Sequence, residues 1–252
     1  MASVARYYRP RMRVLVGIGL FVLFVIGAVL GLVLGVTIIF WVSLVRGARA
    51  VHAQGLVVRA EVIAVDAAVG PTIAGPAVVR LSGAFEDQQG SSDILGLETR
   101  LQRAAADPSV GDQDLVFGTF NSFWTAQKDK AATDAGDYIA NKYSTVTPWW
   151  TGPLGPVVLH LAPPPPAARD RGTDRVSRLD ADLASDRARF TLSAGDVPVA
   201  ELRLVERLND SGARLRVSMF RCGRGIRPVG LRNGVRATVY PISELARRIR
   251  GG

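Results

Sequence analysis

The sequence predicts an α+β protein, an antiparallel β-barrel of about eight strands with surrounding helices, preceded by one transmembrane helix. A single long apolar run lies near the N-terminus, eight short runs rich in β-branched residues follow it, and helical patterns lie among them. A chain of 252 residues has room for one domain plus such an appendage. We divide it into a basic tail (1–13), a transmembrane helix (14–45) and a folded domain (46–252).

The apolar run from Val14 to Val45 contains no charged residue. Its 32 residues exceed the roughly 20 that cross a bilayer core as a helix, so it predicts a retained, single-pass anchor in the cell membrane. A cleaved signal peptide has a shorter apolar core of about 7–15 residues. Four arginines precede the run and three follow it closely. The positive-inside rule therefore leaves undecided on which side of the membrane the folded domain lies.

Gly27, Gly31 and Gly35 recur every four residues within this run. They place a smooth stripe on one helix face, where a second copy of the chain or another membrane protein can approach closely. The alternative is that glycine is simply common in membrane helices. The sequence leaves both interpretations open.

Alternating or β-branched segments predict the strands of the barrel, with Gly and Pro turns between them. They cover residues 55–66, 77–82, 93–101, 114–120, 157–161, 188–192, 199–205 and 214–218. Helical patterns cover residues 129–143 and 174–187, and a last helix begins at about residue 242. Four consecutive prolines at 163–166 predict a stiff extended connector inside one domain, because neither flank is long enough for a second core.

Charge and composition exclude several function classes. The formal net charge is +9, but basic residues alternate with acidic ones and no basic block with interleaved aromatics occurs, which argues against nucleic-acid binding. Cys222 is the single cysteine and there are two histidines, so neither an internal disulfide nor a zinc site is expected. Phosphate-binding, nucleophile-elbow and dinucleotide-binding motifs are absent.

Four segments in order resemble the catalase family. They are the RxxHAxG-like stretch from Arg49 through His52 to Gly55, the VRxS-like residues 79–82 with GSSD at 90–93, GDQDLVF at 111–117, and RATVYP at 236–241 with Arg247 beyond it. They extend over nearly the whole folded part, and GRGIRPVG at 223–230 is typical of the short catalase-related proteins. The resemblance implies a barrel that binds haem b.

The resemblance also implies roles for these residues. Tyr240 is the expected iron ligand as phenolate, with Arg236 one helical turn before it favouring the deprotonated oxygen. His52 is the expected distal acid and base, held by Ser82, with Gln113 where the family has a distal asparagine. Arg49, Arg80 and Arg247 are expected to pair with the haem propionates.

Two departures shift the expected activity. Gln113 is one methylene longer than asparagine, with Asn121 as a substitute donor, and the sequence has no convincing copy of the family's phenylalanine-rich channel segment. A wider entrance favours a peroxidase that reduces hydrogen peroxide or organic hydroperoxides with an unknown reductant. The alternative is a non-catalytic membrane subunit or scaffold on the same fold, because fold does not fix function.

Overall fold

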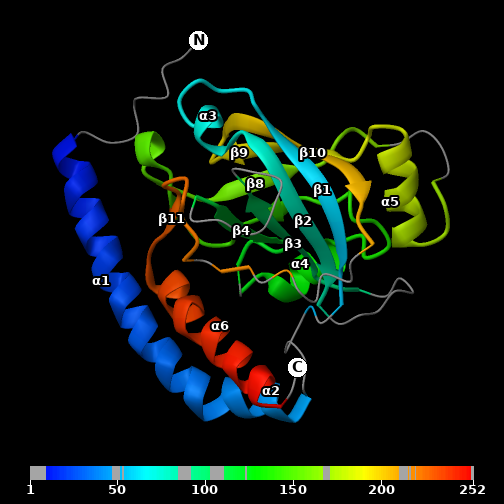
Figure 1. Cartoon of the computed structure of the whole chain (residues 1–252). Helices are drawn as coiled ribbons and strands as arrows, with labels where there is room; N and C mark the ends of the chain where they lie inside the picture. Colours follow the sequence, from blue (N-terminus) through cyan, green and yellow to red (C-terminus); the bar gives the residue numbers. More distant parts are fainter. Residues whose placement is uncertain are drawn as a thin grey trace.

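A computed structural model of the whole chain describes residues 10–46, 52, 54–84, 92–102, 111–122, 124–166, 171–209, 215, 217–218 and 220–250. Within these residues, one N-terminal apolar rod lies beside a domain of strands and shorter helices (Figure 1). The rod joins α1 (Pro10–Leu34), a π-helical turn η2 (Gly35–Ile39) and α2 (Phe40–Arg46). Its stretch from Met12 to Val45 is long and apolar enough to span a membrane, which length and composition alone show.

Eight antiparallel strands close into a barrel, in the order β1-β10-β9-β8-β5-β4-β3-β2. Their bounds are β1 Leu56–Ala64, β2 Gly75–Gly83, β3 Leu95–Leu101, β4 Gln113–Gly118, β5 Tyr143–Ser144, β8 Leu159–Ala162, β9 Arg189–Ala194 and β10 Val197–Arg207. The last long strand, β10, pairs with the first, β1, and this contact closes the barrel. The predicted closed antiparallel barrel is therefore confirmed.

The barrel interior is filled with side chains. Alternate residues point inward, so each buried residue of one strand meets a buried residue of the next. Val79 pairs with Thr99 and Leu81 with Leu97, and Leu97 in turn pairs with Phe117. These residues are at most 3% exposed. These inward-facing side chains therefore form a packed core inside the barrel.

Smaller elements cover the barrel ends. A three-stranded sheet joins β11 (Arg227–Pro228), β6 (Trp149–Trp150) and β7 (Pro156–Val157) in that order, with the short helix η3 (Gly152–Leu154) between the last two. The other helices are α3 (Gly70–Ile73), α4 (Ala126–Ala132), α5 (Arg175–Ala184) and α6 (Leu231–Ile249). Asp174 caps α5 by accepting hydrogen bonds from the backbone N–H groups of Val176 and Ser177.

The eighth strand differs from the prediction. Residues 215, 217 and 218, the described part of the segment 214–218, are not in a strand. The barrel is completed by β5, which has two residues and lies at the end of the helix predicted over 129–143. That helix ends at Ala132, and Asp137 then accepts hydrogen bonds from the N–H groups of Ile139 and Ala140. Such side-chain acceptors hold turns and compete with a helix.

Helix α6 begins at Leu231, about eleven residues before the predicted start. Pro241 favoured a start near residue 242, because proline lacks the N–H of a helix interior. In the structure Pro241 lies inside the helix, which packs against the apolar rod. Tertiary packing therefore outweighs the local cost of the proline.

The glycine stripe packs within the chain. A Cβ atom on Gly27 would lie 1.9 Å from the carbonyl oxygen of Leu231, and one on Gly31 would lie 2.3 Å from Oγ1 of Thr238. Gly35 faces Ile242 in the same way, and Gly234 of α6 faces the carbonyl of Phe24. The surface predicted for a second copy or a membrane partner is thus occupied by α6 of the same chain.

Candidate functional site

His52 and Ser82 form a polar pair at one end of the barrel. Nδ1 of His52 lies 3.0 Å from Oγ of Ser82, and the His52 N–H donates to the carbonyl of Ala84. His52 has φ = 59°, a left-handed conformation that costs energy for any residue other than glycine. Such strain persists where the surroundings hold it, and it concentrates at functional sites. The contact fixes the ring, and when Nδ1 donates to Ser82 the basic nitrogen is Nε2.

Glycines on the outer wall of the barrel make room for this imidazole. Leu81 and Leu97 point inward, so their neighbours Ser82 and Gly96 point outward. A Cβ atom on Gly96 would lie 2.9 Å from both Cε1 and Nδ1 of His52. Gly96 is paired with Gly118, and a Cβ atom there would lie 2.9 Å from the Phe120 ring. The sequence prediction missed this requirement, because only the strand register brings the glycines to the histidine.

Arg80 supports the backbone of His52. Its Nη2 donates to the His52 carbonyl at 2.8 Å, and its Nη1 lies 3.5 Å from Oε2 of Glu98 on β3. The Arg80 side chain is 0% exposed, and Gly55 leaves the room that its guanidinium needs. Arg80 therefore holds the backbone of His52, and its predicted pairing with a haem propionate stays a prediction.

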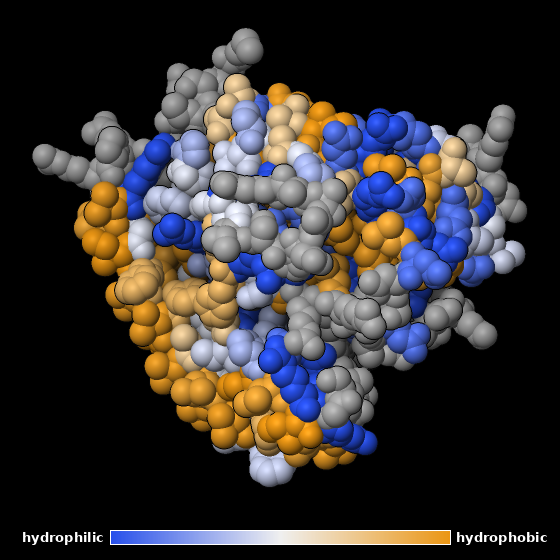
Figure 2. All heavy atoms as spheres, viewed as in Figure 1, coloured by the Kyte–Doolittle hydropathy of each residue, from blue (hydrophilic) through white to orange (hydrophobic). Residues whose placement is uncertain are grey.

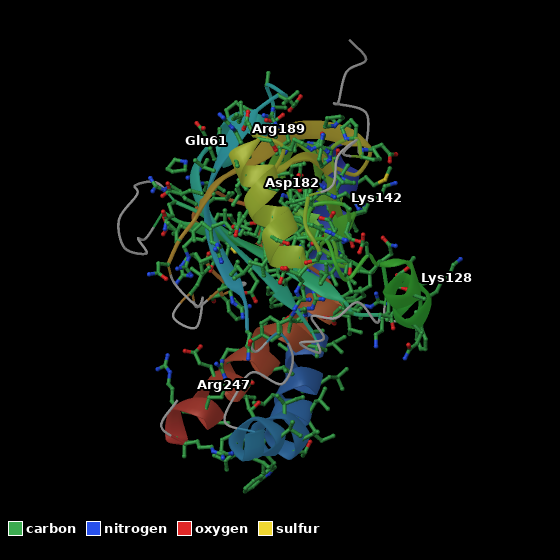
Figure 3. The ribbon with its side chains drawn as sticks, turned by 90° about the vertical axis from the view of Figure 1, so that its right-hand side faces the viewer. Glu61, Lys128, Lys142, Asp182, Arg189 and Arg247 are labelled. Atoms are coloured by element: carbon green, nitrogen blue, oxygen red, sulfur yellow. The ribbon has the colours of Figure 1, made fainter. Side chains whose placement is uncertain are left out.

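Tyr240 lies on the face of α6 that points away from the apolar rod. It is 42% exposed, and it shares one helical stripe with Arg236, four residues before it, and Arg247, seven after it. Nη1 of Arg236 donates to the Thr145 carbonyl at 3.4 Å and lies 3.3 Å from Oγ1 of Thr147. Arg247 donates to the Ser243 carbonyl one turn earlier and lies toward the far end of the helix (Figure 3). The three predicted proximal residues therefore share one surface.

This stripe and the His52 site are anchored on one row of the barrel wall, three strands apart, which is roughly 14 Å. Ser82, Gly96, Gly118 and Ser144 are register partners on successive strands, and Thr145 follows Ser144 directly. Arg236 contacts Thr145, so this stripe is anchored at the end of β5, whereas His52 is held at β2. Asn233 fixes the helix there by accepting from Oγ1 of Thr147 and donating to the Pro148 carbonyl.

Gln113 lies away from this site. It pairs with Leu101, which is five residues along β3 from Gly96. Gln113 therefore lies roughly 16 Å along the strand direction from the position of Gly96. Its side chain is 0% exposed and donates to the Asp114 carbonyl. The structure does not bring Gln113 to His52. Asn121, the substitute, follows β4 at the same barrel end as Gly118 and Ser144.

The remaining predicted residue, Arg49, lies outside the described residues. The second histidine, His160 on β8, pairs in register with Ser144 and Ser193, and burial lowers its pKa. Burial also raises the pKa of the Cys222 thiol, which keeps it protonated at neutral pH.

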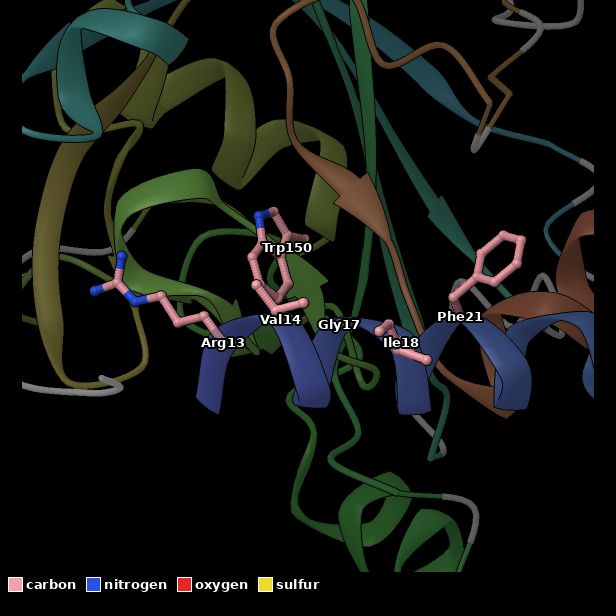
Figure 4. A pocket seen from close by; sticks show the side chains of 6 residues that line it. All are labelled: Arg13, Val14, Gly17, Ile18, Phe21 and Trp150. Atoms are coloured by element: carbon pink, nitrogen blue, oxygen red, sulfur yellow. The ribbon is translucent and has the colours of Figure 1, made fainter. Parts of the chain in front are cut away.

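Two pockets lie elsewhere on the surface. One is apolar and is lined by the start of α1, where the Trp150 ring stands against Gly17 (Figure 4). The other is polar and lies near the opposite barrel end; it is lined by Asp112, Ser218, Phe220, Arg221, Cys222, Gly223 and Arg227. Neither includes His52, Ser82 or Tyr240.

Comparison with known proteins assigns no relative. No protein-family model matches the chain, and no curated protein matches it significantly. The site is therefore interpreted from its own geometry.

The role of Gly96 can be tested directly. Gly96→Ala is expected to displace the imidazole from Ser82, at a cost of about 1 kcal/mol for the lost hydrogen bond. Because the chain has two histidines, ¹⁵N-histidine NMR can follow His52 with His160 as internal reference. Gly19→Ala is the control, since no atom lies within 4 Å of its added Cβ. An unchanged His52 signal in Gly96→Ala would contradict the steric role.

Proposed function

We propose that the chain is a membrane-bound, catalase-related haem protein that acts as a peroxidase on hydrogen peroxide or organic hydroperoxides. The observation that carries the proposal is the strained histidine held by a serine on the barrel wall. It is supported by Arg236, on the same stripe of α6 as Tyr240, which contacts Thr145 three strands along that wall. The ordered sequence resemblance to catalases points to the same residues.

The side chains present suit a ferric haem. Tyr240 offers a phenol oxygen, a ligand type that favours oxidised iron, and Arg236 and Arg247 place positive charge on the same stripe. Tyr240 would hold the iron, Arg247 would pair with a propionate, and Arg49 keeps that role as a prediction from sequence. When bound, haem supplies the two-electron reduction of the peroxide O–O bond.

His52 supplies the proton chemistry in this proposal. Its Nε2 accepts the proton of the bound peroxide and returns it to the departing oxygen, which leaves as water or as an alcohol. Ser82 keeps the ring in one orientation, and Arg80 holds the backbone that carries it. Two electrons and two protons, supplied by an organic reductant, would release the other peroxide oxygen as water and complete the turnover.

Membrane attachment comes from the apolar rod, which is long and apolar enough to span a bilayer. The sequence expectation is a single pass through the cell membrane. A rod that lies in the plane of one leaflet would instead keep the N-terminus on the same side of the membrane as the barrel. Labelling of the two ends from each side of the membrane distinguishes these two orientations.

The cofactor assignment is tested by the visible spectrum of the full chain purified in detergent. We expect a ferric tyrosinate spectrum that Tyr240→Phe abolishes or shifts, because phenylalanine has no oxygen to bind iron. Tyr8→Phe, in the N-terminal tail, is the matched control and should leave the spectrum unchanged.

Two outcomes would contradict the proposal. An unchanged spectrum in Tyr240→Phe would refute the proximal assignment. A protein that stays colourless after reconstitution with haem would refute haem binding itself. The second outcome would favour a non-catalytic membrane subunit on the same barrel.

A further inference from the structure

The apolar rod is attached to the folded domain along most of its length. Near its start the Trp150 ring lies 3.7 Å from the position of a Cβ on Gly17, and the Leu20 carbonyl accepts from the Gly230 N–H. Near its end Oγ of Ser43 lies 2.7 Å from Oγ of Ser243, and the Leu44 carbonyl accepts from Arg250. From Gly17 to Leu44 these contacts span roughly 40 Å of helix.

That length decides what enters the bilayer with the rod. The contacts run in the same order along the rod and along α6, so the two helices are parallel neighbours (Figure 1). A bilayer core is about 30 Å thick. If the docked rod crossed it, α6 would cross beside it.

Helix α6 is unsuited to hydrocarbon. It carries charges along its whole length, which are Arg232, Arg236, Glu244, Arg247 and Arg248, with Arg250 following the last turn. Charged side chains near the centre of a bilayer are costly and are usually paired or face water. Glu244 pairs with Arg248, and the helix carries four arginines for its one glutamate, so its net charge is positive.

The other faces of the rod suit lipid. Large apolar side chains on them are widely exposed, for example Leu15 at 70%, Phe21 at 65% and Val45 at 73%. Figure 2 shows hydrophobic residues gathered in a band along the outer edge of the molecule, where α1 and α2 lie in Figure 1. Leu245 and Ile249 extend the apolar surface onto the end of α6. The band is one-sided on the whole molecule, because α6 packs on the opposite face of the rod.

We propose that the rod lies along the plane of one phospholipid leaflet, with its apolar band in the acyl region. The barrel and the N-terminal tail then lie on the same side of the membrane. The arginines at the end of α6 sit at the rim of this band, at the level of the lipid phosphates. This orientation satisfies the exposed apolar surface and keeps the charges of α6 in water, and it does not depend on the proposed haem function.

The first test is the sidedness of the two ends of the rod. Single cysteines are introduced in a Cys222→Ser background at Ser3→Cys, in the tail, and at Lys128→Cys, on helix α4 whose described residues are all partly or fully exposed. Sealed right-side-out and inverted vesicles from the expression host are treated with a membrane-impermeant maleimide. We expect both cysteines to react in one vesicle type and both to be protected in the other. Reaction in opposite vesicle types would overturn the proposal and establish a single pass.

A second measurement uses depth. Leu15→Cys, Val29→Cys and Val45→Cys carry a bimane fluorophore in the same background, and nitroxide lipids quench it from a shallow or a deep acyl position. A rod in the plane gives the same shallow quenching ratio at all three positions. Deep quenching at Val29 with shallow quenching at both ends would overturn the proposal. Neither readout involves haem, so failure here is distinguishable from failure of the proposed peroxidase.

Discussion

Replacing His52 with asparagine is expected to lower peroxide turnover by about 10²–10⁴-fold, the usual contribution of a positioned acid and base. Asparagine suits the test because it tolerates the left-handed conformation that His52 adopts at φ = 59°. Its amide can still meet Ser82, but it has no nitrogen that takes up a proton near neutral pH. Steady-state peroxidase assays on the haem-loaded full chain measure the effect.

His160→Asn is the matched control for that variant. His160 is the other histidine of the chain and lies on the β8 wall of the same barrel. Its removal should leave turnover within about twofold, as for a substitution that touches no reacting group. Equal losses in both variants would show that the assay reports on folding. Full activity in His52→Asn would remove His52 from the mechanism.

The second large effect is on stability and is independent of any cofactor. Asp114 on β4 is 0% exposed and accepts hydrogen bonds from Nε of Arg100 at 2.9 Å and from its Nη2 at 3.3 Å. It also binds the Arg221 guanidinium and accepts from the Ser218 N–H at 2.7 Å. One carboxylate thus joins β3, β4 and the segment that precedes β11.

Asp114→Asn keeps the shape and removes the charge, which leaves the buried Arg100 guanidinium without its anion. Breaking a buried pair in this way costs about 3–5 kcal/mol. For a domain of this size the cost corresponds to a fall in Tm of roughly 6–20 °C. Thermal unfolding in detergent, followed by circular dichroism, measures it.

Asp180→Asn makes the same chemical change at the surface. Asp180 pairs with Arg207 at 3.1 Å, but both side chains are about two-fifths exposed. An exposed pair contributes roughly 0–1 kcal/mol, so the control should unfold close to the parent. Equal effects of the two substitutions would contradict the argument that burial makes the Asp114 network important.

Most barrel strands were predictable because alternation is a local property. The segments predicted at 55–66, 77–82 and 93–101 match β1, β2 and β3 within about two residues. The two-residue strand β5 has too few positions to alternate, so its pairing with β4 and β8 alone makes it a strand. The helical pattern over 129–143 likewise gave no sign that Asp137 accepts hydrogen bonds from the N–H groups of Ile139 and Ala140 and so holds a turn there.

The candidate site divides in the same way. The resemblance in sequence named His52 and Ser82, and the structure places them in contact across 30 residues of chain. It also named Gln113. The register of β4 against β3 pairs Gln113 with Leu101, five residues along β3 from Gly96, which lies beside His52. Gly96, Glu98 and Thr147 carried no signal of their own, because their importance lies in which neighbour they face.

Local residue patterns are enough to predict a lipid-compatible N-terminal helix and a barrel with inward-facing apolar residues. Both follow from the order of apolar and polar residues along short stretches, and neither needs a distant partner. Only the tertiary structure decided that β10 closes on β1, that the glycine stripe binds α6, and that Arg80 holds His52. These contacts join segments far apart in the chain, and their geometry depends on strand register and helix packing, which local patterns do not encode.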